Sequence, residues 1–209
     1  MIEEGSIRSR AKAMKLLNRL INKAKAIRLR GSSPEKRAEL LRNQLYHVGT
    51  GVKLWTYYFG TEPYLISIHD YVIVAANVHF INHDVSAHTI RRFLDKPESY
   101  TIDKVNKIEL MDNCMVGAFS VLMPGVTVGK NSIVAAGSVV TKSIPDNEIW
   151  GGAPARFIMT TEEYAKKQLE ISDSYPWMQN GKMLVDVNSK EMVRMRQQYF
   201  FEQRSMGKT

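Results

Sequence analysis

Six consecutive six-residue units occupy the stretch from residue 110 to residue 145. Each unit opens with an aliphatic residue, in order Leu110, Val116, Leu122, Val128, Val134 and Val140. A small or aliphatic residue follows four positions later, in order Cys114, Ser120, Val126, Ser132, Ser138 and Ile144. A strict period of six is too long for one face of a helix and too regular for a sandwich strand, and it is typical of parallel β-helices. The repeat therefore predicts a chain that winds in coils.

The same period predicts which residues stack on one another. If three units make one triangular coil, equivalent residues of successive coils lie roughly 4.8 Å apart, the spacing of paired strands. The predicted stacked pairs are Leu110 with Val128, Val116 with Val134, and Leu122 with Val140. An earlier coil is predicted from the same spacing of Ile68, Val74 and Phe80, and the pattern begins near Val48. An aliphatic core should fill the resulting prism.

Two segments around the repeats carry a family resemblance. They run from Leu122 to Asn147 and from Trp150 to Arg156, the latter reading Trp-Gly-Gly-Ala-Pro-Ala-Arg. These residues resemble the hexapeptide-repeat acyltransferases, in particular the galactoside and maltose acetyltransferases, nearly continuously over residues 108–158 and more faintly over 48–83. The resemblance implies a left-handed coil, which spacing alone cannot show. The expected fold is mainly β: a left-handed parallel β-helix with N-terminal and C-terminal helices and one extruded loop.

The chain is expected to divide into three regions. They are a basic, helical N-terminal region (1–46), the β-helix (47–159) and a helical C-terminal extension (160–209). The six-residue period is lost over 84–107, which we interpret as a functional loop extruded from one corner of the prism. Further helices are predicted from Glu35 to Gln44, from Thr160 to about Glu170 and from Lys190 to Phe201.

The net charge of +8 is concentrated near the N-terminus. Residues 8–30 carry nine Lys or Arg residues and no acid, and their apolar residues recur at helical spacing up to Gly31. One interpretation is a helix that packs on the body or on a neighbouring subunit. The other is attachment to an anionic membrane surface or an acidic, lipid-linked glycan. Nucleic acid is disfavoured because the segment has no aromatic residue for base stacking.

Composition indicates a cytoplasmic protein, with peripheral attachment to the inner membrane as the alternative. The sequence has neither a signal segment nor an apolar run near the ~20 residues that cross a bilayer. Cys114 is the only cysteine, which excludes an internal disulfide, and its inward repeat position predicts a buried thiol that is a poor nucleophile.

His83 is the first candidate catalytic residue, because it stands where the regular coil stops and the loop starts. The resemblance implies that His83 is the general base that deprotonates the acceptor hydroxyl. Imidazole suits this chemistry, since it titrates near neutrality and can pass the proton on to the leaving thiolate. Asp84 either orients the imidazole or caps the turn into the loop. No metal is required.

The resemblance also implies the donor and the assembly: acetyl-coenzyme A in a groove between two subunits of a homotrimer. The backbone N–H of Ala118 would stabilise the oxyanion. Ala118 and Ala136 match small positions along the pantetheine arm. The positions that reach the phosphate-bearing end of coenzyme A are matched by Thr141, Lys142 and Arg156, and cations there suit phosphate.

The acceptor is expected to be a sugar hydroxyl of a bacterial surface polysaccharide or its precursor. Aromatic rings stack on sugar faces and carboxylates accept hydroxyl hydrogen bonds, so the candidate acceptor residues are Trp55, Tyr57, Tyr58 and Glu62. Core packing explains at least half of these four residues equally well. His69 and Met111 depart from the family pattern, which often has glycine there, and predict local irregularity of the coil.

Three other functions stay open on the sequence alone. The spacing of His47, His83 and His88 is like that of the zinc ligands of gamma-type carbonic anhydrases, which have the same fold. An acyltransferase acting on an amine or on serine is a second alternative, and a non-catalytic β-helix scaffold is a third. The particular sugar, its hydroxyl and the length of the acyl group are not specified by the sequence.

Overall fold

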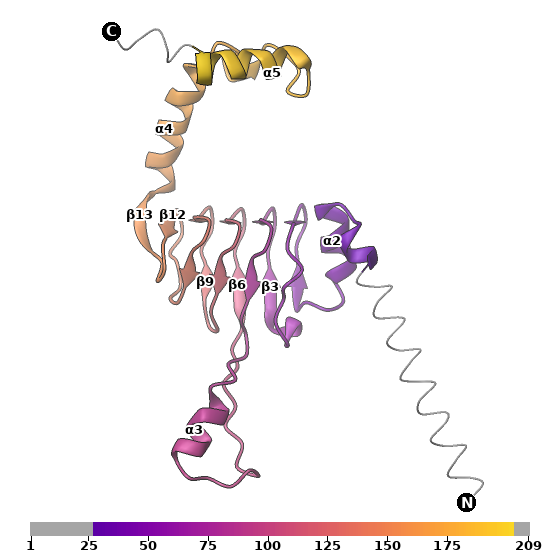
Figure 1. Cartoon of the computed structure of the whole chain (residues 1–209), viewed down its shortest axis with the longest axis vertical. Helices are drawn as coiled ribbons and strands as arrows, with labels where there is room; N and C mark the ends of the chain where they lie inside the picture. The colour runs from indigo at the N-terminus through magenta and orange to yellow at the C-terminus, as the bar shows by residue number, and fades with distance from the viewer. Residues whose placement is uncertain (1–26, 203–209) are drawn as a thin grey trace, which may run out of the picture. The chain divides into compact units, whose positions relative to one another are not determined.

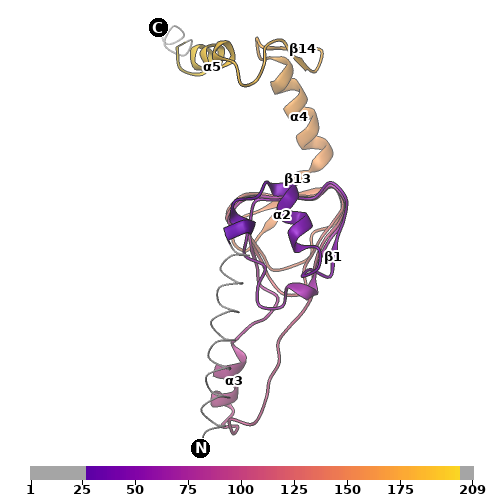
Figure 2. The ribbon, with the colours of Figure 1, turned by 90° about the vertical axis from the view of Figure 1, so that its right-hand side faces the viewer.

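The chain winds into a triangular prism of stacked parallel strands (Figures 1 and 2). The computed structural model describes residues 27–202. Face A contains β1 (His47–Val48), β3 (Ile66–Ile68), β6 (Ile108–Leu110) and β9 (Thr127–Val128). Face B contains β2 (Lys53–Leu54), β4 (Ile73–Val74), β7 (Met115–Val116), β10 (Ile133–Val134) and β12 (Glu148–Gly151). Face C contains β5 (His79–Phe80), β8 (Val121–Leu122) and β11 (Val139–Val140). Three stacked parallel faces are the arrangement of a left-handed β-helix, so the predicted fold class is confirmed.

The predicted stacking register is also confirmed. Leu110 pairs with Val128, Val116 with Val134 and Leu122 with Val140. The earlier coil continues the same columns, since Ile68 pairs with Leu110, Val74 with Val116 and Phe80 with Leu122. The departures at His69 and Met111 leave the ladder regular, because their N–H groups donate to Leu110 O and Val128 O, each at 2.9 Å.

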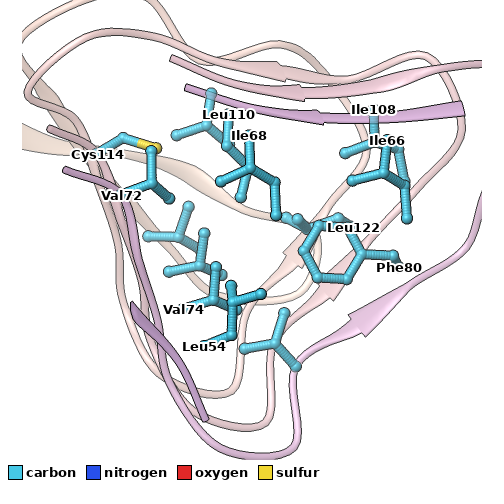
Figure 3. Close-up of a cluster of buried hydrophobic side chains, with 14 of the residues drawn as sticks. Leu54, Ile66, Ile68, Val72, Val74, Phe80, Ile108, Leu110, Cys114 and Leu122 are labelled. Carbon is cyan, nitrogen blue, oxygen red and sulfur yellow. The ribbon is translucent and has the colours of Figure 1, made fainter. Parts of the chain in front are cut away.

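The columns of aliphatic side chains fill the prism (Figure 3). All six small or aliphatic positions predicted to point inward are buried, including Cys114 and three serines. The serine hydroxyls are satisfied by backbone: Ser132 donates to Pro145 O and Ser138 to Ala135 O, each at 2.6 Å. The predicted burial of Cys114 is confirmed, and this burial raises the pKa of its thiol to about 12, which disfavours the reactive thiolate.

We name the three edges of the prism by the faces they join. The AB corner turns the same way in every coil, through a residue with positive φ, in order Gly51, Tyr71, Asn113, Asn131 and Asn147. Asparagine tolerates this left-handed conformation. The amides also stack, since Asn113 Nδ2 donates to Asn131 Oδ1 and Asn131 Nδ2 to Asn147 Oδ1, each at 2.9 Å. This ladder closes the AB corner.

Helix α2 (Pro34–Leu41) covers the first coil. Its predicted Ser-Pro start is confirmed, because Ser33 caps the helix by accepting from Lys36 N at 3.2 Å and Pro34 follows. Among residues 27–202, the buried Arg37 guanidinium donates only to backbone carbonyls, those of Leu29, Ser32 and Leu54. These bonds let a cation be buried at the end of the prism without a carboxylate partner.

The basic helix predicted over residues 8–30 lies outside the described residues except for its end. Residues 27–30 are helical, and the predicted stop is confirmed by Gly31 N, which donates to Ile27 O at 3.0 Å. Leu29 packs against the core of the prism. Within the described residues, no helix is long and apolar enough to cross a membrane.

After the last coil the chain reverses as β13 (Arg156–Thr160), an antiparallel partner of β12 that the sequence did not predict. A second compact unit begins at Glu162. It contains most of α4 (Thr161–Asp173), a hairpin of β14 (Met178–Gln179) and β15 (Lys182–Met183), and α5 (Lys190–Gln197), followed by a π-helical turn (Gln198–Glu202). Both predicted C-terminal helices are present; the hairpin was not predicted.

Candidate active site at the root of the extruded loop

The extruded loop leaves and rejoins the prism at the CA corner, between β5 and β6 (Figure 1). Its two strands are joined at the root, where Asn106 N donates to Asn82 O at 2.9 Å and Asp84 N to Lys104 O at 3.0 Å. His83 forms an antiparallel bridge with Val105 at the same level. The loop is not wholly irregular as predicted, since it contains a short helix, α3 (Ala87–Phe93). The backbone of His83 is therefore held between the coil and the returning chain.

The imidazole of His83 is paired with the carboxylate of Glu62. His83 Nδ1 and Glu62 Oε1 lie 2.7 Å apart, and the Glu62 side chain is only 16% exposed. The carboxylate also accepts a hydrogen bond from the Thr61 hydroxyl. Because a carboxylate only accepts, Nδ1 carries the hydrogen and Nε2 presents a lone pair. This is the tautomer that a general base needs.

The side chain of Asn82 holds the backbone of Glu62 in place. Its fully buried amide donates to Glu62 O and accepts from Glu62 N at 3.4 Å. Gly60 has a φ of 70°, and an added Cβ there would lie 2.4 Å from Asn82 Oδ1. The chain entering Glu62 therefore passes so close to Asn82 that only glycine fits.

The charges around His83 favour its protonated form. The hydrogen bond to Glu62 raises the pKa of His83, and the charges of Glu62, Asp103 and Asp84 act in the same direction. The pKa of Glu62 is lowered, chiefly by Thr61 and then by His83. On the other side of the ring, Asp103 Oδ1 is 3.8 Å from Nε2. An imidazolium formed during a reaction would thus be stabilised from both sides.

Asp84 makes the contacts of a turn-capping residue. Its carboxylate accepts from Ser86 N at 2.8 Å and from Lys104 Nζ at 2.5 Å, and these bonds lower its pKa to about 2. It influences His83 through its charge only. The carboxylate on His83 Nδ1 is that of Glu62, which the sequence had assigned to acceptor binding. The spacing of Glu62 and His83 contains no signal that would pair them.

A pocket of about 280 Å³ opens beside His83 within the loop. The polar side chains that line it are His83, His88, Arg91, Tyr100, Thr101 and Asp103. A ligand could therefore be held against Nε2 of His83 by residues of the loop itself. None of the pocket residues beyond His83 and His88 was singled out by the sequence as a site residue.

Ala118 and Ala136 lie at a different edge, the BC corner, in successive coils. Gly137 N donates to Ala118 O at 2.8 Å, which joins the two turns. Within residues 27–202, neither Ala118 N nor Ala136 N has a hydrogen-bond partner, although the flanking N–H groups of Gly117 and Gly137 do. A small side chain beside an available N–H is the combination expected for an oxyanion donor next to an extended ligand.

The predicted site residues fall into two groups in one chain. Lys142 and Thr141 are exposed at the CA corner, two coils beyond His83, while Arg156 begins β13 near the BC corner. The CA group consists of His83, Glu62, Thr141 and Lys142, and the BC group of Ala118, Ala136 and Arg156. Face C separates them by about six extended residues at roughly 3.3 Å each, roughly 20 Å in all. One chain does not bring the two groups together.

The aromatic residues suggested for acceptor binding also lie in different parts of the prism. The Tyr57 ring packs beneath the Arg37 guanidinium at 4.3 Å and its hydroxyl donates to Arg30 O at 3.3 Å, which places it among the residues that cover the first coil. Tyr58 is 45% exposed on face C and stacks on His79 with ring centroids 4.3 Å apart. Trp55 is exposed at the BC corner. Tyr57 is thus used in packing, whereas Tyr58 and Trp55 are accessible.

The three histidines of the zinc alternative lie on different elements. His47 is on β1 beside His69, with ring centroids 5.3 Å apart, whereas His83 and His88 line the loop pocket. In the part of the chain that the structure describes, no three His, Cys, Asp or Glu side chains are grouped so that they could hold a metal ion.

Comparison with known proteins identifies similar chains for the later coils. Residues 107–142 match the family model described as bacterial transferase hexapeptide, six repeats. Over residues 107–142, the coils match bacterial transferase hexapeptide repeats. The matched segment of hexapeptide repeats contains β6 to β11, and therefore both BC-corner alanines and both CA-corner residues Thr141 and Lys142. The resemblance to hexapeptide-repeat acetyltransferases is thereby confirmed.

Curated relatives extend the match beyond the hexapeptide repeats. Protein CapG of Staphylococcus aureus is 44% identical over 115 residues, 55% of this chain and 64% of its own length. Galactoside O-acetyltransferase of Escherichia coli is 38% identical over 98 residues, 46% of this chain and 45% of its own length. The chain thus spans between about half and two thirds of the length of these relatives.

Among solved structures, a hexapeptide-repeat acetyltransferase from Vibrio cholerae superposes with a TM-score of 0.50. The superposition covers 71% of this chain and 92% of the other, at 23% sequence identity. At this identity the likeness supports the hexapeptide-repeat fold alone.

Proposed function

We propose that this protein is an acetyl-coenzyme A-dependent O-acetyltransferase that acetylates a sugar hydroxyl with His83 as general base. The observation that carries the proposal is the His83–Glu62 pair. In the neutral imidazole, Nδ1 carries the hydrogen shared with Glu62 and the free Nε2 lies beside the pocket, on the coil that precedes the matched hexapeptide repeats. The class of reaction is supported by the relatives, one of which is named galactoside O-acetyltransferase.

The proposed reaction needs no covalent enzyme intermediate. Nε2 of His83 takes the proton of the acceptor hydroxyl as its oxygen attacks the thioester carbonyl carbon, which forms a C–O bond and a tetrahedral oxyanion. The intermediate collapses with cleavage of the C–S bond. The leaving thiolate takes the proton back from the imidazolium, which gives free coenzyme A and the acetyl ester. Glu62 and Asp103 stabilise the imidazolium between the two transfers.

The separation of the two groups of residues supports a site shared between subunits. His83 at the CA corner of one chain would face the Ala118 and Ala136 N–H groups at the BC corner of another, so that acceptor and donor meet at the interface. Three chains, each placing its CA corner against the BC corner of the next, would repeat this contact in a closed ring, which is a homotrimer. Lys142 and Arg156 would then approach the coenzyme A phosphates from the two sides of the groove.

The acceptor proposed is a hydroxyl of a bacterial surface polysaccharide or of its precursor. The accessible rings of Tyr58 and Trp55 suit the apolar face of a sugar, and the loop pocket is open enough to admit one residue of a longer glycan. We place the enzyme in the cytoplasm, where acetyl-coenzyme A is made, with the basic segment 8–30 as the part that could meet a membrane or a lipid-linked acceptor.

The test is release of free thiol from acetyl-coenzyme A in the presence of sugars, nucleotide-sugars, amino sugars and serine. Wild type, His83→Ala and His47→Ala are compared, and the metal content of the purified chain is measured in parallel. We expect release that depends on a sugar acceptor and on His83, and that His47→Ala preserves. Equal loss in both histidine variants together with one bound zinc per chain would overturn the proposal in favour of the zinc enzyme.

A further inference from the structure

The loop pocket contains a cation that the proposed reaction does not use. Arg91, on the last turn of α3, lines the pocket together with His83, and its side chain is only 14% exposed. A guanidinium so far removed from water is unfavourable unless anions or hydrogen-bond acceptors surround it. What surrounds Arg91 in this chain therefore indicates what the pocket is built to receive.

The protein itself satisfies Arg91 only in part. Nη1 donates to Glu98 O at 2.7 Å, and the Glu98 carboxylate is 3.8 Å from Nη2, beyond hydrogen-bond distance, and 92% exposed. Within the described residues, no other hydrogen bond of the five guanidinium N–H donors is present. Arg37, the buried arginine of the prism, differs: its guanidinium donates to three carbonyls. Within the described residues, most N–H donors of the Arg91 guanidinium thus have no acceptor.

The remaining charges of the pocket do not compensate Arg91. The only carboxylate in its lining, Asp103, is 3.8 Å from Nε2 of His83 and matches the charge of the imidazolium. The pocket also presents the Tyr100 hydroxyl, the Thr101 hydroxyl and the His88 ring, all able to donate to an oxygen anion. The pocket thus contains both a base that could deprotonate a hydroxyl, His83, and a guanidinium that could bind an oxyanion, Arg91.

We propose that the acceptor sugar carries an anionic group, and that Arg91 binds this group while a hydroxyl of the same sugar reaches His83. This inference rests on the proposed function and specifies its substrate class. The oxyanion is the carboxylate of a uronic acid or the phosphate of a glycosyl phosphate. A guanidinium binds either through two parallel hydrogen bonds, which fixes the ring and hence the hydroxyl presented to Nε2.

The experiment compares acceptors that differ only in charge. Methyl glucuronide and glucosyl phosphate are each set against methyl glucoside, and kcat/KM for thiol release is measured with wild type, Arg91→Gln, Arg91→Lys and Arg92→Gln. Arg92 is the matched control, because it neighbours Arg91 on α3 but is exposed and does not line the pocket. The two charged acceptors distinguish a carboxylate from a phosphate as the bound group.

We expect wild type to prefer one charged acceptor over the neutral sugar by at least ~10-fold, as an arginine–oxyanion pair allows. Arg91→Gln should abolish this preference by raising KM for the charged acceptor, while kcat/KM for the neutral sugar changes less than ~3-fold. Arg91→Lys should retain part of the preference, since it keeps the charge but not the fork. Arg92→Gln should retain all of it.

Two results would overturn the inference. One is a wild type that uses methyl glucoside as well as the charged acceptors. The other is an equal loss toward all acceptors in Arg91→Gln, as expected if Arg91 only holds the loop together through Glu98. Binding of methyl glucuronide and glucosyl phosphate is also measured directly by calorimetry, without acetyl-coenzyme A. Binding of a charged acceptor that needs Arg91, without thiol release, would keep the inference and reject the proposed reaction. Thiol release with neutral sugars alone would keep the proposed reaction and reject the inference.

Discussion

The AB and CA corners are built from the same coils, yet they differ in almost every physical respect. At the AB corner each coil turns through one left-handed residue, and the amides of Asn113, Asn131 and Asn147 bond from coil to coil. At the CA corner this regularity is broken by an extruded loop, and the side chains of His83 and Glu62 bond to each other across two coils.

The difference shows that one corner of a repeat can serve stability while another carries the candidate site. The three asparagine turns satisfy one another from coil to coil, so we expect them to contribute to stability. The interrupted corner loses those repeated bonds, and its polar groups are instead satisfied by specific partners such as Asn82 on Glu62 and Lys104 on Asp84. Changes at the AB corner should therefore alter stability, and changes at the CA corner should alter chemistry.

The largest expected effect is that of His83→Ala. Turnover should fall by at least ~100-fold, a typical general-base contribution, because the variant lacks the imidazole that takes the proton of the acceptor hydroxyl in the proposed reaction. The measurement is kcat for thiol release, with the thermal midpoint and coenzyme A affinity as controls that should stay near wild type. A variant that turns over normally would remove His83 from the chemistry.

Next in size is Asn131→Ala at the AB corner. It removes both amide hydrogen bonds and places alanine at a φ of 55°, which should lower the free energy of unfolding by about 2 kcal/mol. Chemical denaturation measures this, and turnover should be unaffected. Asn77→Ala is the matched control: Asn77 has a φ of 57° but no side-chain hydrogen bond within the described residues, so we expect about 1 kcal/mol. Equal losses in the two variants would show that the ladder contributes nothing.

Glu62→Gln should lower kcat/KM by about 10-fold near neutral pH and also shift its pH profile. The carboxylate raises the pKa of His83, so activity falls as pH drops through that raised value and the imidazole is protonated. Without the carboxylate the pKa decreases, and the acid limb of the profile should move to lower pH. Glu109→Gln, whose partner is Lys107 at 2.6 Å, is the control and should leave the profile in place. An unmoved limb in Glu62→Gln would mean that Glu62 does not act on the base.

The smallest effect is expected for Lys142→Ala at the CA corner. Loss of one exposed cation that we propose to face the coenzyme A phosphates should raise the dissociation constant of coenzyme A about three- to fivefold, and added salt should weaken the difference. Lys130→Ala, at the AB corner beside Asp112 at 3.2 Å, is the matched control and should not alter it. Calorimetry at two salt concentrations measures both; equal affinities for wild type and Lys142→Ala would exclude Lys142 from the donor site.

Much of the prism could be predicted because its contacts are regular along the chain. In a coil with a constant repeat, the residue above Leu110 is determined by counting, and the structure has Val128 there. Counting fails where the repeat ends. The return strand β13 and the hairpin of β14 and β15 carry no six-residue period, and neither was predicted.

The candidate site was predicted only in part, for the same reason. His83 could be named because a histidine at the end of a coil has a recognisable context. The partner of its Nδ1 could not be named from the sequence. The position of Glu62 depends on the close approach of Gly60 to Asn82 and on the hydrogen bond from Glu62 N to the buried Asn82 amide. Asp84, adjacent to His83 in sequence, was the simpler expectation, but its carboxylate faces Ser86 N and Lys104 instead.

The sequence by itself determined the coil, its register and the buried core, and it indicated His83 as the candidate base, since each depends on a period or a motif that local spacing encodes. Only the tertiary structure decided that Glu62 holds His83, that Arg91 is sequestered beside it with donors unfilled, and that the Ala118 and Ala136 N–H groups lie at another edge of the prism. These relations join residues of unequal separation across a loop or a face. Their physical cause is the packing of particular side chains, which no repeat length specifies.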